Sequence, residues 1–237
     1  MAERLGIIGA MQVEVDLLIE QMDDDRTTTV SGMDFHEGVL HGVDVVVVRC
    51  GIGKVNAAMC AQTLIVDFGA TRVINTGVAG ALEESLHVGD LVVSTDAVHH
   101  DMDVVGLGYA PGVVPEMEDT GKLAFAADPL MVQAVLRAAA EVAPDLHATP
   151  GRIASGDQFV CEREDRERII GTFGAHCCEM EGTPIAQVCY RNDVPFVIVR
   201  AISDNADDTS KLEYRDAEAQ TARLCAGIVA RAVELLA

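Results

Sequence analysis

The sequence predicts an α/β fold with a mixed, largely parallel and buried β-sheet. Short β-branched apolar runs alternate with amphipathic stretches along nearly the whole chain, which is the pattern of strands joined by crossover helices. The run Val43–Val48 alternates too little to have a solvated face, so we expect it to form a central strand. With 237 residues, 49% of them hydrophobic, the chain can bury one sizeable core, which predicts a single domain over residues 1–237.

The N-terminal part of the chain combines strand–helix units with hairpins. The dipeptides Ser31-Gly32 and His41-Gly42 separate three successive strand-type runs, which is typical of tight turns between antiparallel strands. The sheet should therefore be mixed. Strands are expected at Leu5–Ile8, Thr27–Ser31, Phe35–Leu40, Val43–Val48, Arg72–Ile74 and Leu91–Val93, and helices at Val13–Met22 and Lys54–Phe68.

The C-terminal part continues the alternation after a long irregular stretch. Helical periodicity is expected at Leu130–Val142 and Thr183–Tyr190, strands at Arg152–Ile153 and Phe196–Ile202, and a final helix near Asp216–Leu236. The stretch from His99 to Gly121 has no clear periodicity and is rich in glycine and proline. A loop of that length in a compact domain is usually functional.

Charge and apolar patterning argue against several partners and locations. Thirty-eight acidic residues against 17 basic ones leave a formal charge of −21, which repels phosphate backbones and anionic lipids, so neither nucleic acid nor a membrane is an expected partner. Glu14 and Asp16 interrupt the segment that a signal peptide would keep apolar, and no later run is long enough to span a bilayer. We expect a cytoplasmic protein.

No metal or organic cofactor is expected. The segment His99–Asp103 holds ligand-type side chains, but its spacing matches no common site, and contiguous ligands rarely converge on one ion, so we interpret it as structural. The seven cysteines are odd in number and contain no C-x-x-C pair, which is typical of reduced thiols that mostly fill the core.

Polar residues that follow the apolar runs are the candidates for chemistry, because ligands of open α/β sheets bind beyond the carboxyl ends of strands. Asp204 ends the buried-type run Phe196–Ile202, where partial desolvation would raise its pKa toward that of a general acid; capping the next helix is the alternative. Glu179 and Glu181 flank Met180, either on one face of an extended segment or splayed at a helix start. Glu14 lies in a first helical turn, which the helix dipole favours in any case.

The glycine-rich turns do not carry a familiar phosphate motif. Gly51-Ile52-Gly53-Lys54-Val55 lacks the Ser or Thr of a Walker loop, and Asn56 breaks the dinucleotide fingerprint. Such glycines instead let the backbone approach a small ligand while its N–H groups remain free to donate, although ordinary strand-to-helix connections look the same.

Six segments in register resemble the 5′-methylthioadenosine/S-adenosylhomocysteine nucleosidase family of the nucleoside phosphorylase superfamily. They are Gly6–Met11 with Glu14, Gly51–Val55, Asn75–Gly77, Ser155–Asp157 with Phe159, Glu179–Glu181 and Val199–Asp204. The resemblance spans nearly the whole chain. It implies a three-layer α/β/α nucleoside phosphorylase-like fold with a mixed central β-sheet, and hydrolysis of the N-glycosidic bond of 5′-thioadenosine nucleosides to adenine and a 5-thioribose.

The resemblance also implies roles for the acids. Cleavage passes through a ribosyl cation with adenine leaving, so Asp204, held by Ser203, would protonate adenine N7. Glu14, helped by Arg200, would deprotonate the attacking water. Glu181 would bind the ribose hydroxyls. The remaining residues expected to contact the substrate are Met11, Ile52, Val78, Ala79, Gly80, Leu107, Phe159, Val160, Glu179, Met180 and Tyr214.

Three positions depart from the common family pattern and bear on substrate choice. Val78 stands where many members carry a serine, and Leu107 and Tyr214 each replace a frequent phenylalanine. Members with a valine at the first position include some that act on 6-amino-6-deoxyfutalosine, which is an alternative substrate. A purine nucleoside phosphorylase and a non-catalytic adenosine-type binder are further alternatives. The family pattern also implies a homodimer in which loop 99–115 reaches the partner's site.

Overall fold

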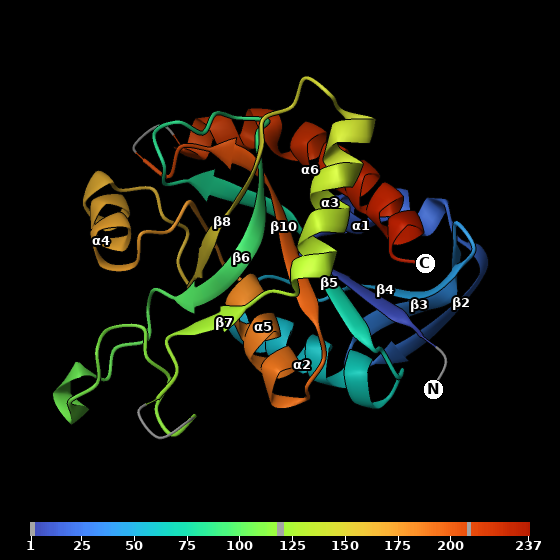
Figure 1. Cartoon of the computed structure of the whole chain (residues 1–237), viewed down its shortest axis with the longest axis horizontal. Coiled ribbons are helices and arrows are strands. Elements are labelled where there is room, and N and C mark those ends of the chain that lie inside the picture. Colours follow the sequence, from blue (N-terminus) through green and yellow to red (C-terminus); the bar gives the residue numbers. More distant parts are fainter. Residues whose placement is uncertain (1–2, 118–120, 208–209) are drawn as a thin grey trace.

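The computed structural model describes residues 3–117, 121–207 and 210–237, and the predicted mixed α/β fold is confirmed (Figure 1). The strands are β1 (Leu5–Gly9), β2 (Asp23–Val30), β3 (Met33–Leu40), β4 (Val43–Arg49), β5 (Arg72–Ala81), β6 (Leu91–His99), β7 (Ala124–Ala126), β8 (Ala148–Ser155), β9 (Cys177–Glu179) and β10 (Phe196–Asp204). The helices are α1 (Gln12–Glu20), α2 (Lys54–Val66), η1 (Val105–Leu107), α3 (Pro129–Val142), α4 (Arg163–Phe173), α5 (Gly182–Arg191) and α6 (Ser210–Leu235).

The strands form one mixed sheet that partly closes on itself. Their order is β10-β6-β8-β9-β5-β1-β4-β3-β2, with β7 added beside β6. Strand β10 also pairs in parallel with β5, so the first five strands of this order close into a ring. The closure brings the carboxyl ends of β5 and β10 to one end of the molecule (Figure 1), where the short antiparallel strand β9 pairs with the last residues of β5.

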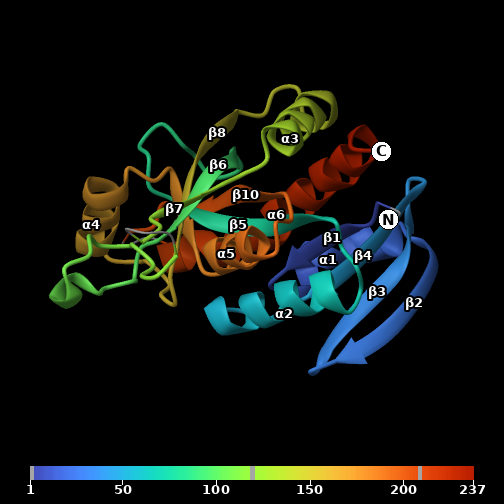
Figure 2. The ribbon, with the colours of Figure 1, turned by 60° about the horizontal axis from the view of Figure 1, so that its bottom comes forward.

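Helices cover both faces of the sheet, which gives the predicted three layers (Figure 2). On one face α6 packs against α1 and α3, and on the other face α2 packs against α5. Neighbouring residues of β1 show why: Ile7 packs in the core beneath α6, and Ile8 packs in the core beneath α2. Both faces are therefore apolar, as the low alternation of the strand sequences predicts.

Some predictions from sequence periodicity were wrong in detail. Strand β4 is buried and paired on both sides, but it lies two strands from the β2 edge and not at the centre of the sheet. Helix α4 was not predicted, because it is highly charged and buries only Ile169 and Phe173. Strands β7 and β9 are three residues long, too short to show a period. Within the part of the chain that the structure describes, no helix is long and apolar enough to cross a bilayer.

Candidate active site

A cavity of about 390 Å³ opens where the carboxyl ends of the strands converge, and its size is typical of small-molecule sites. The starts of α1, α5 and α6 complete its wall. The lining residues are Ala10, Met11, Glu14, Ile52, Val78, Ala79, Gly80, Gln158, Phe159, Val160, Cys178, Glu179, Met180, Glu181, Ser203, Asp204 and Tyr214.

Glu14 is buried in the first turn of α1, and its carboxylate is surrounded by backbone N–H groups. Its Oε2 accepts hydrogen bonds from the amides of Ala10 at 2.7 Å and Met11 at 2.9 Å, and its Oε1 accepts one from Val78 at 3.2 Å. A Cβ on Gly77 would lie 2.5 Å from Oε1, so only glycine leaves room for this carboxylate. Burial raises the pKa of Glu14, against the opposing effects of the Arg200 charge and the three amides. A carboxylate with a raised pKa suits a general base.

Arg200 lies behind the cavity in a fully buried ion pair with Glu179. The Nη2 atom of Arg200 donates to both Glu179 Oε2 and Asn75 Oδ1, each at 2.5 Å. Burial alone would lower the pKa of Arg200, but the charges of Glu179, Glu14 and Glu181 raise it, so the guanidinium stays charged. The structure thus places a permanent positive charge beside Glu14.

Glu179 is held by the protein on both carboxylate oxygens. Oε1 accepts a short hydrogen bond from Ser155 Oγ, while Oε2 also accepts the amides of Glu181 at 3.0 Å and Gly182 at 2.7 Å. Burial would raise the pKa of Glu179, but Arg200 and these donors hold it below its usual value. Glu179 is therefore an ionised residue that fixes Arg200 and the start of α5.

Glu181 is the neighbouring acid that faces the cavity, and it occupies the N-cap position of α5 without a side-chain hydrogen bond to that helix. Its Oε1 accepts the amide of Gly53 at 2.8 Å, which ties it to the turn before α2. Burial and the negative charge of Glu179 raise the pKa of Glu181 to about 8. Glu179 and Glu181 thus differ in role: one is buried and charged beside arginine, and the other retains a proton near neutral pH.

Asp204 reaches the cavity because β10 contains a bulge. The register with β5 shifts between Ile202 and Asp204, so Asp204 lies opposite Gly80 and Ser203 is the extra residue. Ser203 Oγ donates to Asp204 Oδ2 at 2.9 Å, and the amide of Ala206 donates to Oδ1 at 2.9 Å. A Cβ on Gly80 would lie 2.9 Å from that Oδ1, so the glycine makes space for the acid.

The rest of the cavity is mainly apolar and aromatic. The rings of Phe159 and Tyr214 meet edge to face with centroids 5.7 Å apart. The Tyr214 hydroxyl donates to Met11 Sδ at 3.2 Å, joining α6 to the turn before α1. Ile52 lines the cavity yet remains 54% exposed. This wall can enclose an apolar or aromatic ligand beside the three acids.

The structure gathers all but two of the residues expected from the sequence around this cavity. Arg200 lies behind Glu14 and acts from there through its charge. Leu107 lies on η1, is 75% exposed and does not line the cavity. Ala10, Gln158 and Cys178 also line it and were not expected, although each is adjacent in sequence to an expected residue. Among the residues that the structure describes, no group of His, Cys, Asp or Glu could hold a metal ion.

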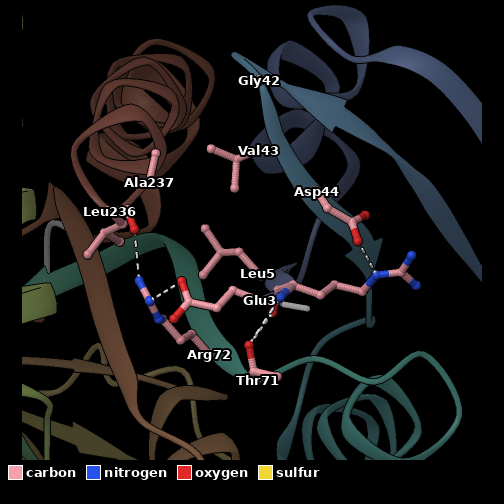
Figure 3. Close-up of a pocket in the computed structure, with 10 residues that line it drawn as sticks. Glu3, Leu5, Gly42, Val43, Asp44, Thr71, Arg72, Leu236 and Ala237 are labelled. Carbon is pink, nitrogen blue, oxygen red and sulfur yellow. Dashed lines mark hydrogen bonds and ion pairs between the residues drawn. The ribbon is translucent and has the colours of Figure 1, made fainter. Parts of the chain in front are cut away.

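A second hollow of about 250 Å³ lies at the opposite ends of β1, β4 and β5 (Figure 3). Its two arginines are already paired: Arg4 Nε contacts Asp44 at 2.9 Å, and Arg72 contacts Glu3 and donates to the Leu236 carbonyl at 2.8 Å. Paired guanidinium groups of this kind hold the strand ends and the C-terminal helix together. We assign this hollow a structural role.

Comparison with known proteins identifies the family. The phosphorylase superfamily matches residues 4–234. A 5′-methylthioadenosine/S-adenosylhomocysteine nucleosidase from Shewanella loihica is 41% identical over 212 residues, which cover 89% of this chain and 90% of that protein. The chain belongs to this nucleosidase family within the phosphorylase superfamily.

Solved structures of the nucleosidase family and of a related hydrolase superpose on nearly the whole chain. The nucleosidase from Neisseria meningitidis, in complex with methylthio-immucillin-A, matches with a TM-score of 0.94 and 38% identity, covering 98% of this chain and 99% of that chain. The futalosine hydrolase of Helicobacter pylori matches with a TM-score of 0.93 and 31% identity, covering 99% of each chain. The family resemblance stated from the sequence is confirmed, and the fold extends to an enzyme named for another nucleoside.

Proposed function

We propose that the protein hydrolyses the N-glycosidic bond of 5′-methylthioadenosine and S-adenosylhomocysteine, releasing adenine and the corresponding 5-thioribose. The arrangement of Glu14 carries this proposal. Its carboxylate accepts hydrogen bonds from the amides of Ala10, Met11 and Val78. Backbone donors of this kind at a helix start can bind an anion. A negative charge there repels phosphate and can accept a proton from water.

The leaving base is protonated at the opposite side of the cavity. Asp204 donates its proton to adenine N7, so that adenine leaves as a neutral base while its bond to C1′ breaks. The hydrogen bond from Ser203 holds the Asp204 carboxyl group in place. Phe159 supplies an aromatic face for adenine, and the Val160 backbone meets the amino edge of the base.

The ribose and the attacking water lie on the side of Glu14 and Glu181. The water oxygen bonds to C1′ as the bond to the base breaks, and Glu14 takes the proton that the water loses. Glu181 binds the ribose hydroxyls. The positive charge of Arg200 stabilises the carboxylate form of Glu14 before Glu14 takes the proton from water.

Two described cations near the site, Arg200 and Lys54, are committed to protein partners, which favours water over phosphate as the acceptor. Arg200 is paired with Glu179, and Lys54 Nζ contacts Asp101 at 2.6 Å. A phosphorylase needs positive groups and free amides for its anion. Arg200 and Lys54 therefore offer less free positive charge than a phosphorylase needs for its anion.

A futalosine-type nucleoside is a second candidate substrate. The similarity to the Helicobacter pylori futalosine hydrolase supports it, together with Val78 in the cavity wall. Adenine release would use the same acids for 6-amino-6-deoxyfutalosine, so the two functions differ at the 5′-substituent alone.

We further propose a homodimer in which η1 of one subunit closes the site of the other. Ile52 and Val55 expose 54% and 73% of their surface beside the cavity, and Leu107 exposes 75% at the tip of the 99–115 loop. A second copy of the chain would bury these apolar side chains and add Leu107 to the 5′ end of the pocket. Light scattering of wild type and Leu107→Glu tests this: an active monomer for the wild type would contradict the proposal.

The decisive assay measures adenine release in phosphate-free buffer for methylthioadenosine, S-adenosylhomocysteine and aminofutalosine. We expect release from both thioadenosines, with free thioribose as the sugar product and no acceleration by phosphate. A sugar 1-phosphate would identify a phosphorylase. Binding of these nucleosides without adenine release would identify a non-catalytic binder.

A further inference from the structure

A closed set of three contacts joins three segments beside the cavity. The Lys54 ammonium group lies 2.6 Å from Oδ1 of Asp101. Oδ2 of Asp101 accepts the backbone amide of Asp157 at 2.9 Å, and Oδ1 of Asp157 accepts the backbone amide of Lys54 at 2.8 Å. None of these three residues is among those that line the cavity. The contacts hold together the start of α2, the turn after β6 and the turn after β8.

Two of these segments carry residues of the candidate site. Phe159 follows Asp157 by two positions and lines the cavity. The amide of Gly53, directly before Lys54, donates to Oε1 of Glu181 at 2.8 Å. Two adjacent amides at the start of α2 therefore hold both the acid assigned to the ribose and the loop that carries the aromatic face assigned to adenine.

The start of α2 receives its capping acceptor from a distant segment. Gly53 is the N-cap residue and has no side chain to accept an amide of the helix, and its φ of +99° favours glycine. A Cβ at this position would lie 3.1 Å from Oδ1 of Asp157. The Asp157 carboxylate takes the place of a local cap by accepting the Lys54 amide. The position of the loop after β8 and the start of α2 therefore depend on each other.

Asp101 holds the loop after β8 as a charged group. Burial would raise the pKa of Asp101, but the hydrogen bonds from Lys54 and the Asp157 amide, together with the Lys54 charge, hold that pKa below its usual value. A charged acceptor forms a stronger hydrogen bond to an amide than a neutral one does. The Lys54 and Asp101 side chains are 21% and 27% exposed, so water shields this pair only in part. Lys54 thereby orients the carboxylate that holds the loop.

We propose that Asp101 is a positioning residue for adenine recognition. Through the Asp157 amide it fixes the loop that carries Phe159. The loop then keeps a constant place relative to Glu181, so the base and the ribose are held in register. This inference rests on the proposed function, which places adenine against Phe159. Asp101 thus gives a binding role to the segment His99–Asp103, for which spacing alone indicated a structural one.

The two products of the reaction separate this role from an effect on the other end of the substrate. Adenine lies against the loop of Phe159, whereas 5-methylthioribose lies on the side of Glu181. Loosening the loop should weaken adenine binding and leave 5-methylthioribose unchanged. Asp101 also lies near the start of loop 99–115, and an effect through that loop on the partner's site would instead weaken 5-methylthioribose, because the proposed place of Leu107 is at the 5′ end of the pocket.

The test measures the dissociation constants of adenine and 5-methylthioribose by calorimetry in the wild type, Asp101→Asn, Lys54→Met and the double variant. Asparagine keeps the shape of aspartate but has one acceptor oxygen and no charge. Methionine removes the ammonium group of Lys54 and leaves its backbone amide in place. Asp96→Asn is the matched control, because it breaks a similarly exposed ion pair, with Arg152, that joins β6 to β8. Steady-state hydrolysis of methylthioadenosine and thermal unfolding are measured on the same preparations.

We expect Asp101→Asn to raise the Kd of adenine about 3- to 10-fold, the effect of one partly exposed hydrogen bond to a charged group, and to leave that of 5-methylthioribose within about twofold. The KM for methylthioadenosine should rise with the adenine Kd, while kcat changes less. Lys54→Met should have a smaller effect in the same direction, and the double variant should match Asp101→Asn, because Lys54 acts through Asp101. Asp96→Asn should bind both products like the wild type, whatever its unfolding temperature.

An adenine Kd within about twofold of the wild type in Asp101→Asn would overturn the positioning role. A rise in the Kd of 5-methylthioribose as large as that of adenine, or an equal loss of adenine binding in Asp96→Asn, would overturn it as well, since either pattern indicates a general disturbance. A wild type that binds adenine but releases none from methylthioadenosine would overturn the proposed function alone. A wild type that binds no adenine would overturn both.

Discussion

Replacing Glu14 by Gln keeps the size of the side chain but removes its charge and one acceptor oxygen. In the native protein two oxygens accept three amides: Oε2 those of Ala10 and Met11, and Oε1 that of Val78. A glutamine side chain can accept two of these three amides if its single oxygen stays on those of Ala10 and Met11. Its NH₂ group then faces the Val78 amide, donor against donor.

The structural cost of this change should be small compared with the loss of activity. One amide loses its acceptor, which costs about 1–3 kcal/mol of folding free energy, while removal of a buried carboxylate offsets part of that cost. Loss of the general base should lower kcat by about 10²–10⁴-fold. KM should change little, because base and ribose contacts are assigned to Phe159, Asp204 and Glu181.

The assay is steady-state adenine release over a range of methylthioadenosine concentrations up to saturation, which gives both kcat and KM, together with thermal unfolding of the same preparation. Glu20→Gln is the matched control, because Glu20 lies exposed at the other end of α1. We expect the control to behave like the wild type in both measurements. The unfolding temperature of Glu14→Gln should shift by only a few degrees, about what 1 kcal/mol produces in a chain of this size.

A Glu14→Gln enzyme with kcat within about threefold of the wild type would refute this reasoning. Glu14 would then be an acid favoured by its helix start, and the preference for water would need another cause. A large loss of kcat accompanied by an equally large rise in KM would also contradict it, since that pattern assigns Glu14 to ground-state binding.

Three other predictions follow from the neighbouring acids. Asp204→Asn should lower kcat for adenine release by about 10²–10⁴-fold, and a variant that keeps half of the activity would remove Asp204 as the acid. Glu179→Gln should lower kcat at least about tenfold and lower the pKa of Glu181, because the charge that raises this pKa is gone; a pH profile of kcat/KM in which the step due to Glu181 is unshifted would leave Glu179 a purely structural residue. Because the folded-state pKa of Glu181 is raised to about 8, the protein loses stability as pH rises from the ordinary glutamate value of 4.5 toward 8. Glu181→Gln should flatten this decline, measured as the unfolding temperature against pH. An equally steep decline in the wild type and in the variant would show that Glu181 is not its source.

Local sequence patterns predicted much of the fold and of the candidate site. The apolar runs located most of the longer strands, although β5 continues to Ala81 and β10 to Asp204, beyond the apolar residues that revealed them. These extensions carry the polar and glycine residues of the site, which periodicity alone does not assign to strands. Leu107 shows a further limit, since it does not line the cavity of its own chain and its proposed place beside a substrate needs a second subunit.

The sequence by itself determined the α/β class, the acidic character of the protein and the strand ends at which Glu14, Glu181 and Asp204 occur, because these follow from local composition and order. Tertiary structure decided what each acid can do. Pairing of β10 with β5 closes the ring, and the bulge at Ser203 turns Asp204 into the cavity opposite Gly80. Glu179 and Glu181 differ by only two positions, yet one is paired with Arg200 and the other is not. Their opposite pKa shifts arise because desolvation and charge pairing depend on distances between segments far apart in the chain.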